Sequence, residues 1–478
     1  MVKLPLHYQT ITELADRIRR GEISASQLTE NLLDRIGMLD GKLNAFKLPC
    51  PELALERARA ADQELKNGND LGVLHGIPYA AKDLFDVKGL PTAAGSRLLE
   101  KNIAAEDSRA IRSLAAAGMI LAGKTNTVQF AFSGIGINHD HGTPHNPWSR
   151  SHYIPGGSSS GSAVAVAAGM VPVALGTDTG GSARAPASLC GTVGLKTTVG
   201  RISRAGVYPL SWTLDSVGVL CRSVEDAALV YQRLQGADVN DEITVGLATH
   251  DVTSTIKGGV SGLRLAFAES VFWEDIDPEV AQAVRACGDV FEELGAGVSS
   301  IDFAEARQAR ELNPGGVIIA SEGYMLNQKW LEGHFDELDP VVAHRMIKGK
   351  DISAGQYLQT NYSARQLRAK AGQTLEGIDA LLVPTIPVPA KPVAEIDTNM
   401  DEYLNHNIRY LRNTSIGNIL NFCGLSLPCG FTASGLPIGL LIYGKPFQED
   451  LILRAGYAYQ QATDWHRQTP DLTWAEKD

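Results

Sequence analysis

The chain has 478 residues, of which 44% are hydrophobic and 20% are charged, and its formal net charge is −11 at pH 7. This composition is typical of a globular protein with a large buried core, and it excludes a wholly disordered chain. The acidic balance argues against a surface that binds nucleic-acid phosphates, so we expect no nucleic-acid partner.

The six cysteines are scattered along the chain, and no CxxC pair occurs among them. This spacing indicates neither a zinc site nor a redox motif, so we predict reduced thiols. The N-terminus lacks the apolar run of a signal peptide, and the apolar stretch 163–175 is too short to span a membrane. We therefore predict a cytoplasmic protein with no membrane partner. We also expect it to be a monomer or a homodimer.

Three helices are predicted near the N-terminus. Apolar residues recur at helical spacing after two capping boxes, T-x-x-E at 10–13 and S-x-x-Q at 24–27. A third helix is predicted from Pro51 to about Lys66. We interpret residues 1–66 as a helical annex of a single domain that spans the whole chain.

From residue 72 onward, short apolar strands alternate with helices. One strand ends near Lys82, another covers 119–122, and a helix ended by Gly169 precedes a strand in VPVALGT. Further elements of both kinds are predicted in LRLAFA, DPEVAQAVRACGDVFEELGA and IDALLVPTIP. This alternation predicts an α/β fold whose sheet is covered by helices on both faces. We interpret 390–412, which is polar and irregular, as a surface loop.

Two clusters of glycine and serine flank a segment of small apolar residues. They read GGSSSG from Gly156 and GTDTGGS from Gly176, which places Ser182 at the end of the second cluster. If Ser182 is a nucleophile, the loop before it can supply an oxyanion hole, because glycine adopts the required dihedral angles and lets a substrate approach. The backbone N–H groups expected to form this hole are those of Thr179, Gly180 and Gly181.

A serine nucleophile needs a base, and neither cluster contains a histidine. Lys82 can serve if burial keeps its amine neutral, and its place at the end of an apolar strand is compatible with burial. A serine of the first cluster can then relay the proton from Ser182 to Lys82. The alternative is a surface lysine and two ordinary turns, and the spacing by itself leaves both open.

The clusters closely resemble the amidase signature family, whose pattern is GGSSGGSA followed by G-[ST]-D-x-GGS-[IV]-R-x-PA. This chain reads GGSSSGSA and GTDTGGSARAPA, and GIPYAAKD matches the lysine segment of the family. The resemblance covers roughly residues 10–470, with a signature core at about 72–230. It implies the amidase signature fold, with a large mixed twisted central sheet. It also implies a catalytic set of the nucleophile Ser182, Ser158 in a cis peptide, and Lys82.

The resemblance implies a hydrolase that forms an acyl-enzyme on small-molecule amides, and sometimes on esters or carbamates, without a cofactor. The alternative is the glutaminase subunit of a tRNA-dependent amidotransferase complex, which works with partner subunits. That protein resembles D-x-x-T-x-P-x-NLAG, and alignment of NLAG with 421–424 places Thr414 where its aspartate holds the glutamine α-amino group. We therefore expect neutral, largely apolar amides, such as aryl amides. Arg345 could still bind a carboxylate, which keeps the alternative open.

Two further features are given structural interpretations. His139, His141 and His145 lie close together in NHDHGTPH, but the family chemistry needs no metal, so we expect a polar loop near the substrate site rather than a metal centre. Asp178 and Arg184 are interpreted as an ion pair that braces the nucleophile loop. Pocket side chains are expected from the loops at 125–155, 310–350 and 405–420.

Another serine motif is rejected. The residues at 157–161 also match G-x-S-x-G, the nucleophile elbow, in which Ser159 would be the attacking residue. That motif requires a buried strand directly before it, and NPWSRSHYIP does not have the pattern of one.

Overall fold

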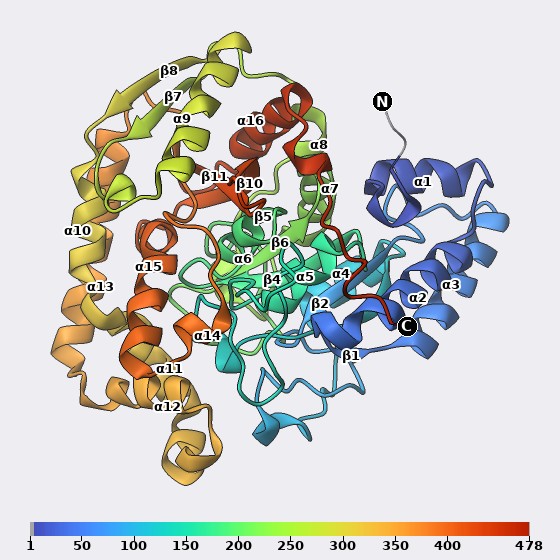
Figure 1. Ribbon diagram of the computed structural model, residues 1–478, viewed down its shortest axis with the longest axis horizontal. Helices are drawn as coiled ribbons and strands as arrows, with labels where there is room; N and C mark the ends of the chain where they lie inside the picture. The colour runs from blue at the N-terminus through green and yellow to red at the C-terminus, as the bar shows by residue number, and fades with distance from the viewer. Residues whose placement is uncertain (1–3, 478) are drawn as a thin grey trace.

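A computed structural model describes residues 4–477 (Figure 1). A single sheet of 11 strands runs through the molecule in the order β1-β3-β2-β4-β6-β5-β10-β11-β9-β7-β8. The strands are β1 (Phe46–Pro49), β2 (Pro78–Lys82), β3 (Ile120–Thr125), β4 (Val173–Asp178), β5 (Val193–Lys196), β6 (Ser216–Cys221), β7 (Arg264–Ala268), β8 (Gly297–Ile301), β9 (Ala380–Pro384), β10 (Cys423–Phe431) and β11 (Pro437–Gly444).

The sheet is mixed. Strand β2 is parallel to β3 and to β4, and β7 is parallel to β8 and to β9, whereas the central strands pair in antiparallel fashion. Ala80 of β2 pairs with Ala174 of β4, so both strands end at the same edge of the sheet. This register places Lys82, the last residue of β2, beside the end of β4.

The helices lie on both sides of the sheet, and α1, α2 and α3 gather at one end of it (Figure 1). The α-helices are α1 (Ile11–Arg19), α2 (Ala25–Leu43), α3 (Pro51–Lys66), α4 (Arg109–Ala116), α5 (Ser160–Ala167), α6 (Arg184–Leu189), α7 (Val224–Leu234), α8 (Val252–Thr255), α9 (Pro278–Glu293), α10 (Ala304–Leu312), α11 (Val317–Gly333), α12 (Pro340–Met346), α13 (Ala354–Thr374), α14 (Val393–Ile396), α15 (Met400–Ile419) and α16 (Glu449–Ala462). The α/β prediction, with helices on both faces, is confirmed.

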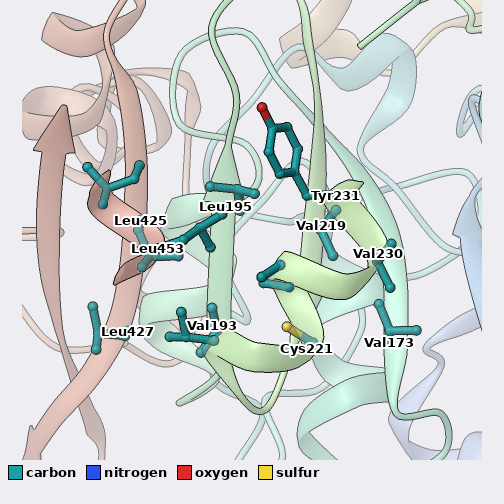
Figure 2. Close-up of a cluster of buried hydrophobic side chains, with 14 of the residues drawn as sticks. Val173, Val193, Leu195, Val219, Cys221, Val230, Tyr231, Leu425, Leu427 and Leu453 are labelled. Carbon is teal, nitrogen blue, oxygen red and sulfur yellow. The ribbon is translucent and has the colours of Figure 1, made fainter. Parts of the chain in front are cut away.

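Alternation along β4 shows how the two faces are filled. Val173 and Leu175 belong to a large apolar cluster that includes residues of α7 and α16, and Figure 2 shows part of this cluster, with Tyr231 and Leu453 beside the strands. Ala174, between them in sequence, packs into a second cluster with the small residues of α5. Successive side chains of a strand point to opposite faces, so β4 is buried on both sides.

The local signals at the N-terminus are confirmed. Both capping boxes form, with Thr10 accepting from the Glu13 N–H and Ser24 accepting from the Gln27 N–H. The six cysteines are free and buried. Across residues 4–477, no helix is long and apolar enough to cross a bilayer.

The interpretation of 390–412 as a loop is wrong. Helix α14 and most of α15 occupy this segment, and Asn399 caps α15 by accepting from the Glu402 N–H. The buried face of α15 carries polar residues, including Asn407, Asn413 and Thr414. Because these side chains are buried through hydrogen bonds, the helix lacks the apolar periodicity that sequence analysis depends on.

Candidate active site

Lys82 is fully buried at the end of β2. Its Nζ donates to Ser158 Oγ at 2.7 Å and to Thr177 Oγ1 at 2.8 Å. Burial lowers the pKa of Lys82 to about 7, although the carboxylates of Asp215 and Asp178 act in the opposite direction. The amine is therefore held by two hydroxyls in a place where its neutral form is accessible near neutral pH.

Ser158 lies just before α5, and the peptide bond between Gly157 and Ser158 is cis. Its carbonyl accepts from Thr127 Oγ1 at 2.9 Å, which fixes the segment from outside. The helix that follows begins in very close packing, since a Cβ on Gly161 would lie 2.1 Å from the carbonyl oxygen of Ala45. The small residues of the first cluster thus allow the segment to enter the interior beside Lys82.

Ser182 lies at the far end of the second cluster, and it is 4% exposed. The N–H of Ser159 donates to the Ser182 carbonyl at 3.1 Å, which joins the two clusters. Within residues 4–477, the Ser182 hydroxyl makes no hydrogen bond. The structure therefore places Lys82 and Ser158 in direct contact and brings the Ser182 segment against the Ser158 segment, without a bond between the two serine hydroxyls.

The nucleophile loop is held by a buried ion pair, as the sequence predicted. Arg184 donates to both carboxylate oxygens of Asp178, each at 2.9 Å, and Asn418 adds a further donor to the carboxylate. Burial would raise the pKa of Asp178, but the Arg184 guanidinium overrides it and holds the pKa far below its usual range. A charged pair with this many partners fixes the loop between the two residues.

The amides of this loop differ in what they contact. The Gly181 N–H, which is one of the three predicted for the oxyanion hole, donates to Asp178 Oδ1 at 2.9 Å. In the described part of the chain, the N–H groups of Thr179 and Gly180 have no acceptor. A Cβ on Gly180 would meet nothing within 4 Å, so there is open space beside Gly180.

Thr414 braces the same loop from α15. Its hydroxyl donates to the Gly180 carbonyl at 2.8 Å, and a Cβ on Gly181 would lie 2.1 Å from it. The position that sequence comparison assigns to an aspartate is therefore occupied by a neutral side chain in contact with the loop.

A cavity of about 270 Å³ adjoins the site. Thr177 and Thr179 are part of its wall, whereas Ser158 and Ser182 are not. Much of the wall is apolar, from Leu84, Ala131, Val207, Tyr208, Leu210 and Trp212. The cavity thus draws on the expected loop at 125–155 only through Ala131, and on the expected loops at 310–350 and 405–420 not at all. The segment 204–217 carries no catalytic motif, so it was not among the loops expected to line the site.

The three histidines have separate partners. His139 contacts Asp339 at 2.6 Å and Asp397 at 2.9 Å, and its hydrogen bond with Asp339 raises its pKa to about 9. His141 lies 3.2 Å from Lys47 Nζ, and His145 contacts two backbone carbonyls. Within residues 4–477, no group of three or more potential ligands is placed to hold a metal ion.

We expect activity to survive exhaustive treatment with a chelator. The groups assembled around Lys82 need no Lewis acid, because proton transfer and oxyanion binding can both be done by the chain. The measurement is the rate before and after dialysis against EDTA, with metal content determined in parallel. A stoichiometric metal whose removal abolishes activity, and whose return restores it, would contradict this expectation.

The family match and the structural neighbours together identify an amidohydrolase. Residues 27–453 match the family model described as Amidase. The chain is 37% identical to a glutamyl-tRNA(Gln) amidotransferase subunit of Chloroflexus aggregans, over 98% of this chain and 99% of that one. It is 38% identical to 2-amino-5-chloromuconic acid deaminase of Comamonas testosteroni, over 92% of this chain and 93% of that one. The structure of 6-aminohexanoate cyclic dimer hydrolase complexed with substrate superposes with a TM-score of 0.87 at 27% identity, covering 98% of this chain and 99% of that one. The chain belongs to the amidase signature family.

Proposed function

We propose that this protein hydrolyses neutral, largely apolar amides through a covalent acyl-enzyme on Ser182. The observation that carries the proposal is the buried contact between Lys82 and Ser158, because it pairs a hydroxyl with an amine whose pKa is lowered to about 7. A base is most effective when its pKa lies near the working pH. No histidine is needed for this chemistry.

In the proposed reaction, neutral Lys82 accepts the proton of Ser158, and Ser158 accepts the proton of Ser182. The Ser182 oxygen then bonds to the substrate carbonyl carbon, and the negative charge on the carbonyl oxygen is stabilised by loop amides. The N–H groups of Thr179 and Gly180 are free for this role, whereas that of Gly181 would have to be shared with Asp178. The C–N bond breaks as the leaving amine takes a proton from Lys82 through Ser158. Water then hydrolyses the ester between Ser182 and the acyl group.

Two observations support an apolar substrate. The cavity beside the site is lined in large part by aliphatic and aromatic side chains, among them Leu210 and Trp212, although Asp215 also belongs to its wall. Thr414 offers no carboxylate to a substrate ammonium group, and burying an ammonium without a charged partner is costly. A neutral acyl or aryl group avoids this cost and removes apolar surface from water.

The second candidate is the glutaminase subunit of a tRNA-dependent amidotransferase. Arg345 favours it, because this half-buried side chain makes no ion pair within the described residues and could bind a substrate carboxylate. Its guanidinium instead donates to the Phe132 carbonyl and lies 4.3 Å from the centre of the Phe132 ring. The relatives named as glutamyl-tRNA(Gln) amidotransferase subunits, at 36–37% identity, are the other reason to test it.

We expect the isolated chain to hydrolyse an apolar anilide with a kcat/KM at least about tenfold above that for glutamine, since one unpaired buried charge is worth that much or more. The measurement is kcat/KM for both substrates on the purified chain. Thr414→Asp is the matched variant, because it restores the carboxylate and should shift the ratio toward glutamine. Preference of the wild-type chain for glutamine, or activity only with added partner subunits, would favour the second candidate.

A further inference from the structure

A second carboxylate, Asp215, lies beside the site without a role in the reaction described above. It directly precedes β6 and is 8% exposed. Oδ1 accepts from Thr179 Oγ1 at 2.5 Å, and Oδ2 accepts from the N–H groups of Leu210 and Ser211, both at 2.9 Å. Every partner is placed as a donor, which favours the ionised carboxylate. Burial acts in the opposite direction and raises the pKa of Asp215, against the hydrogen bonds from Thr179, Ser211 and Leu210.

Asp215 and Lys82 contact two neighbouring hydroxyls at the end of β4. Lys82 contacts the hydroxyl of Thr177, and Asp215 contacts the hydroxyl of Thr179, two residues further along the chain. Thr177 lies in β4, and Thr179 directly follows the end of this strand at Asp178. Thr177, Thr179 and Asp215 also line the same cavity, so the carboxylate and the amine approach one space from two neighbouring hydroxyls.

The other charged groups around Lys82 are neutralised. Asp178 is paired with Arg184, and Asp83, which follows Lys82, is paired with Lys124 at 2.7 Å. On the cavity side, Arg204 is paired with Asp241 at 3.0 Å. Among the described residues Asp215 makes no ion pair, although the charge of the Arg204 guanidinium acts on it.

We propose that Asp215 is a positioning residue of the proposed hydrolytic site, which anchors Thr179 at the start of the oxyanion loop and places a negative charge against Lys82. The inference rests on the proposed function, because it assumes that Lys82 is the base and that the Thr179 amide receives the oxyanion. Its geometric half is the bond between Thr179 and Asp215. Its electrostatic half follows from the charge that this bond brings to the cavity wall, since a negative charge favours the protonated form of an amine.

The loop that carries Asp215 is itself held from outside. The carboxylate of Glu322, on α11, accepts from the hydroxyls of Ser211, Thr213 and Tyr357 and from the Thr213 N–H. These bonds fix residues 211–213 independently of Asp215. A substitution of Asp215 therefore leaves the loop with its second anchor, which makes a folded variant the expected result.

The test is the pH dependence of covalent labelling of Ser182 by a fluorophosphonate, which needs no knowledge of the substrate. Labelling forms an O–P bond and releases fluoride, and the serine proton passes through Ser158 to Lys82. In the wild-type protein, the rate should rise through the pKa of Lys82. In Asp215→Asn, loss of the negative charge should move this rise toward lower pH by about half a unit or more. The plateau rate should fall by about tenfold, because one amide oxygen cannot satisfy all three donors.

Two variants separate the halves of the proposal, and a third controls for charge. Thr179→Val removes the hydrogen bond to Asp215 without a change of charge. The plateau labelling rate should therefore fall, while the pH at which the rate increases stays the same. Thr179→Ser should restore the rate. Glu242→Gln removes one exposed charge from the same region of the chain and should leave the rise in place, because solvent screens it.

Two results would overturn the inference, and they are distinguishable. If the labelling rate of the wild-type protein does not increase with pH, or if Ser182 is not labelled, both the proposed function and the inference are wrong. A normal wild-type rise that Asp215→Asn leaves in place, in a folded variant, would overturn the inference alone. Circular dichroism and thermal unfolding of each variant establish that it is folded.

Discussion

Ser182→Ala is expected to abolish acyl-enzyme formation and to lower kcat by about 10⁴-fold or more, the scale seen when a serine nucleophile is removed. The hydroxyl makes no hydrogen bond within residues 4–477, so its loss removes the attacking atom without opening a network. Stability should therefore change little. The measurement combines kcat on an apolar anilide with mass spectrometry of the protein after fluorophosphonate treatment, in which the wild-type adduct is expected on Ser182.

Ser160→Ala is the matched control for this experiment. Ser160 is buried at the start of α5, and its hydroxyl has no partner, so the same change of atoms is made near Ser158 without touching the proposed reaction. Its activity should stay within a few-fold of wild type. An adduct on Ser159 in the wild-type protein would instead revive the nucleophile-elbow interpretation and contradict the proposed role of Ser182.

Lys82→Met is expected to be nearly as damaging as Ser182→Ala, because the base and the two serines act as one unit. Methionine keeps the length of the side chain and removes the amine, so Ser158 and Thr177 both lose their partner. A fully active Lys82→Met variant, verified by mass spectrometry, would end the proposed role of the lysine.

The wild-type pH profile follows from the same residue. The pKa of Lys82 is lowered to about 7, and the base must be neutral to accept a proton. Below this pKa the amine is protonated and inactive, so kcat/KM should rise as pH increases through about 7 and level off above it. Thr177→Val changes the surroundings of Lys82 only in part, because the amine keeps its contact with Ser158 and loses the Thr177 hydroxyl. A profile that is flat between pH 6 and pH 8, about one unit on either side of that pKa, would contradict this assignment.

Much of the fold could be predicted from local sequence signals. The capping boxes at Thr10 and Ser24, and the alternation of short apolar strands with helices, predicted elements that the structure contains. Helix α15 was not predicted, and the reason is physical. Its buried positions include Asn413, whose amide donates to the carbonyls of Phe272 and Pro384. Partners so distant in sequence give no periodic signal.

The sequence by itself determined the α/β class, the family and the two clusters with their lysine, because these depend on local spacing and on motifs that few other chains share. Tertiary structure decided the rest. The pairing of β2 with β4 brings Lys82 to Thr177 and Ser158, and burial there lowers the pKa of the amine. The hydrogen bond that engages the Gly181 amide, the cavity wall at 204–217 and the contact between Asp215 and Thr179 join segments far apart in the chain or depend on a particular loop conformation. Such contacts arise only when the sheet has formed, because desolvation and hydrogen-bond geometry depend on neighbours that no local pattern specifies.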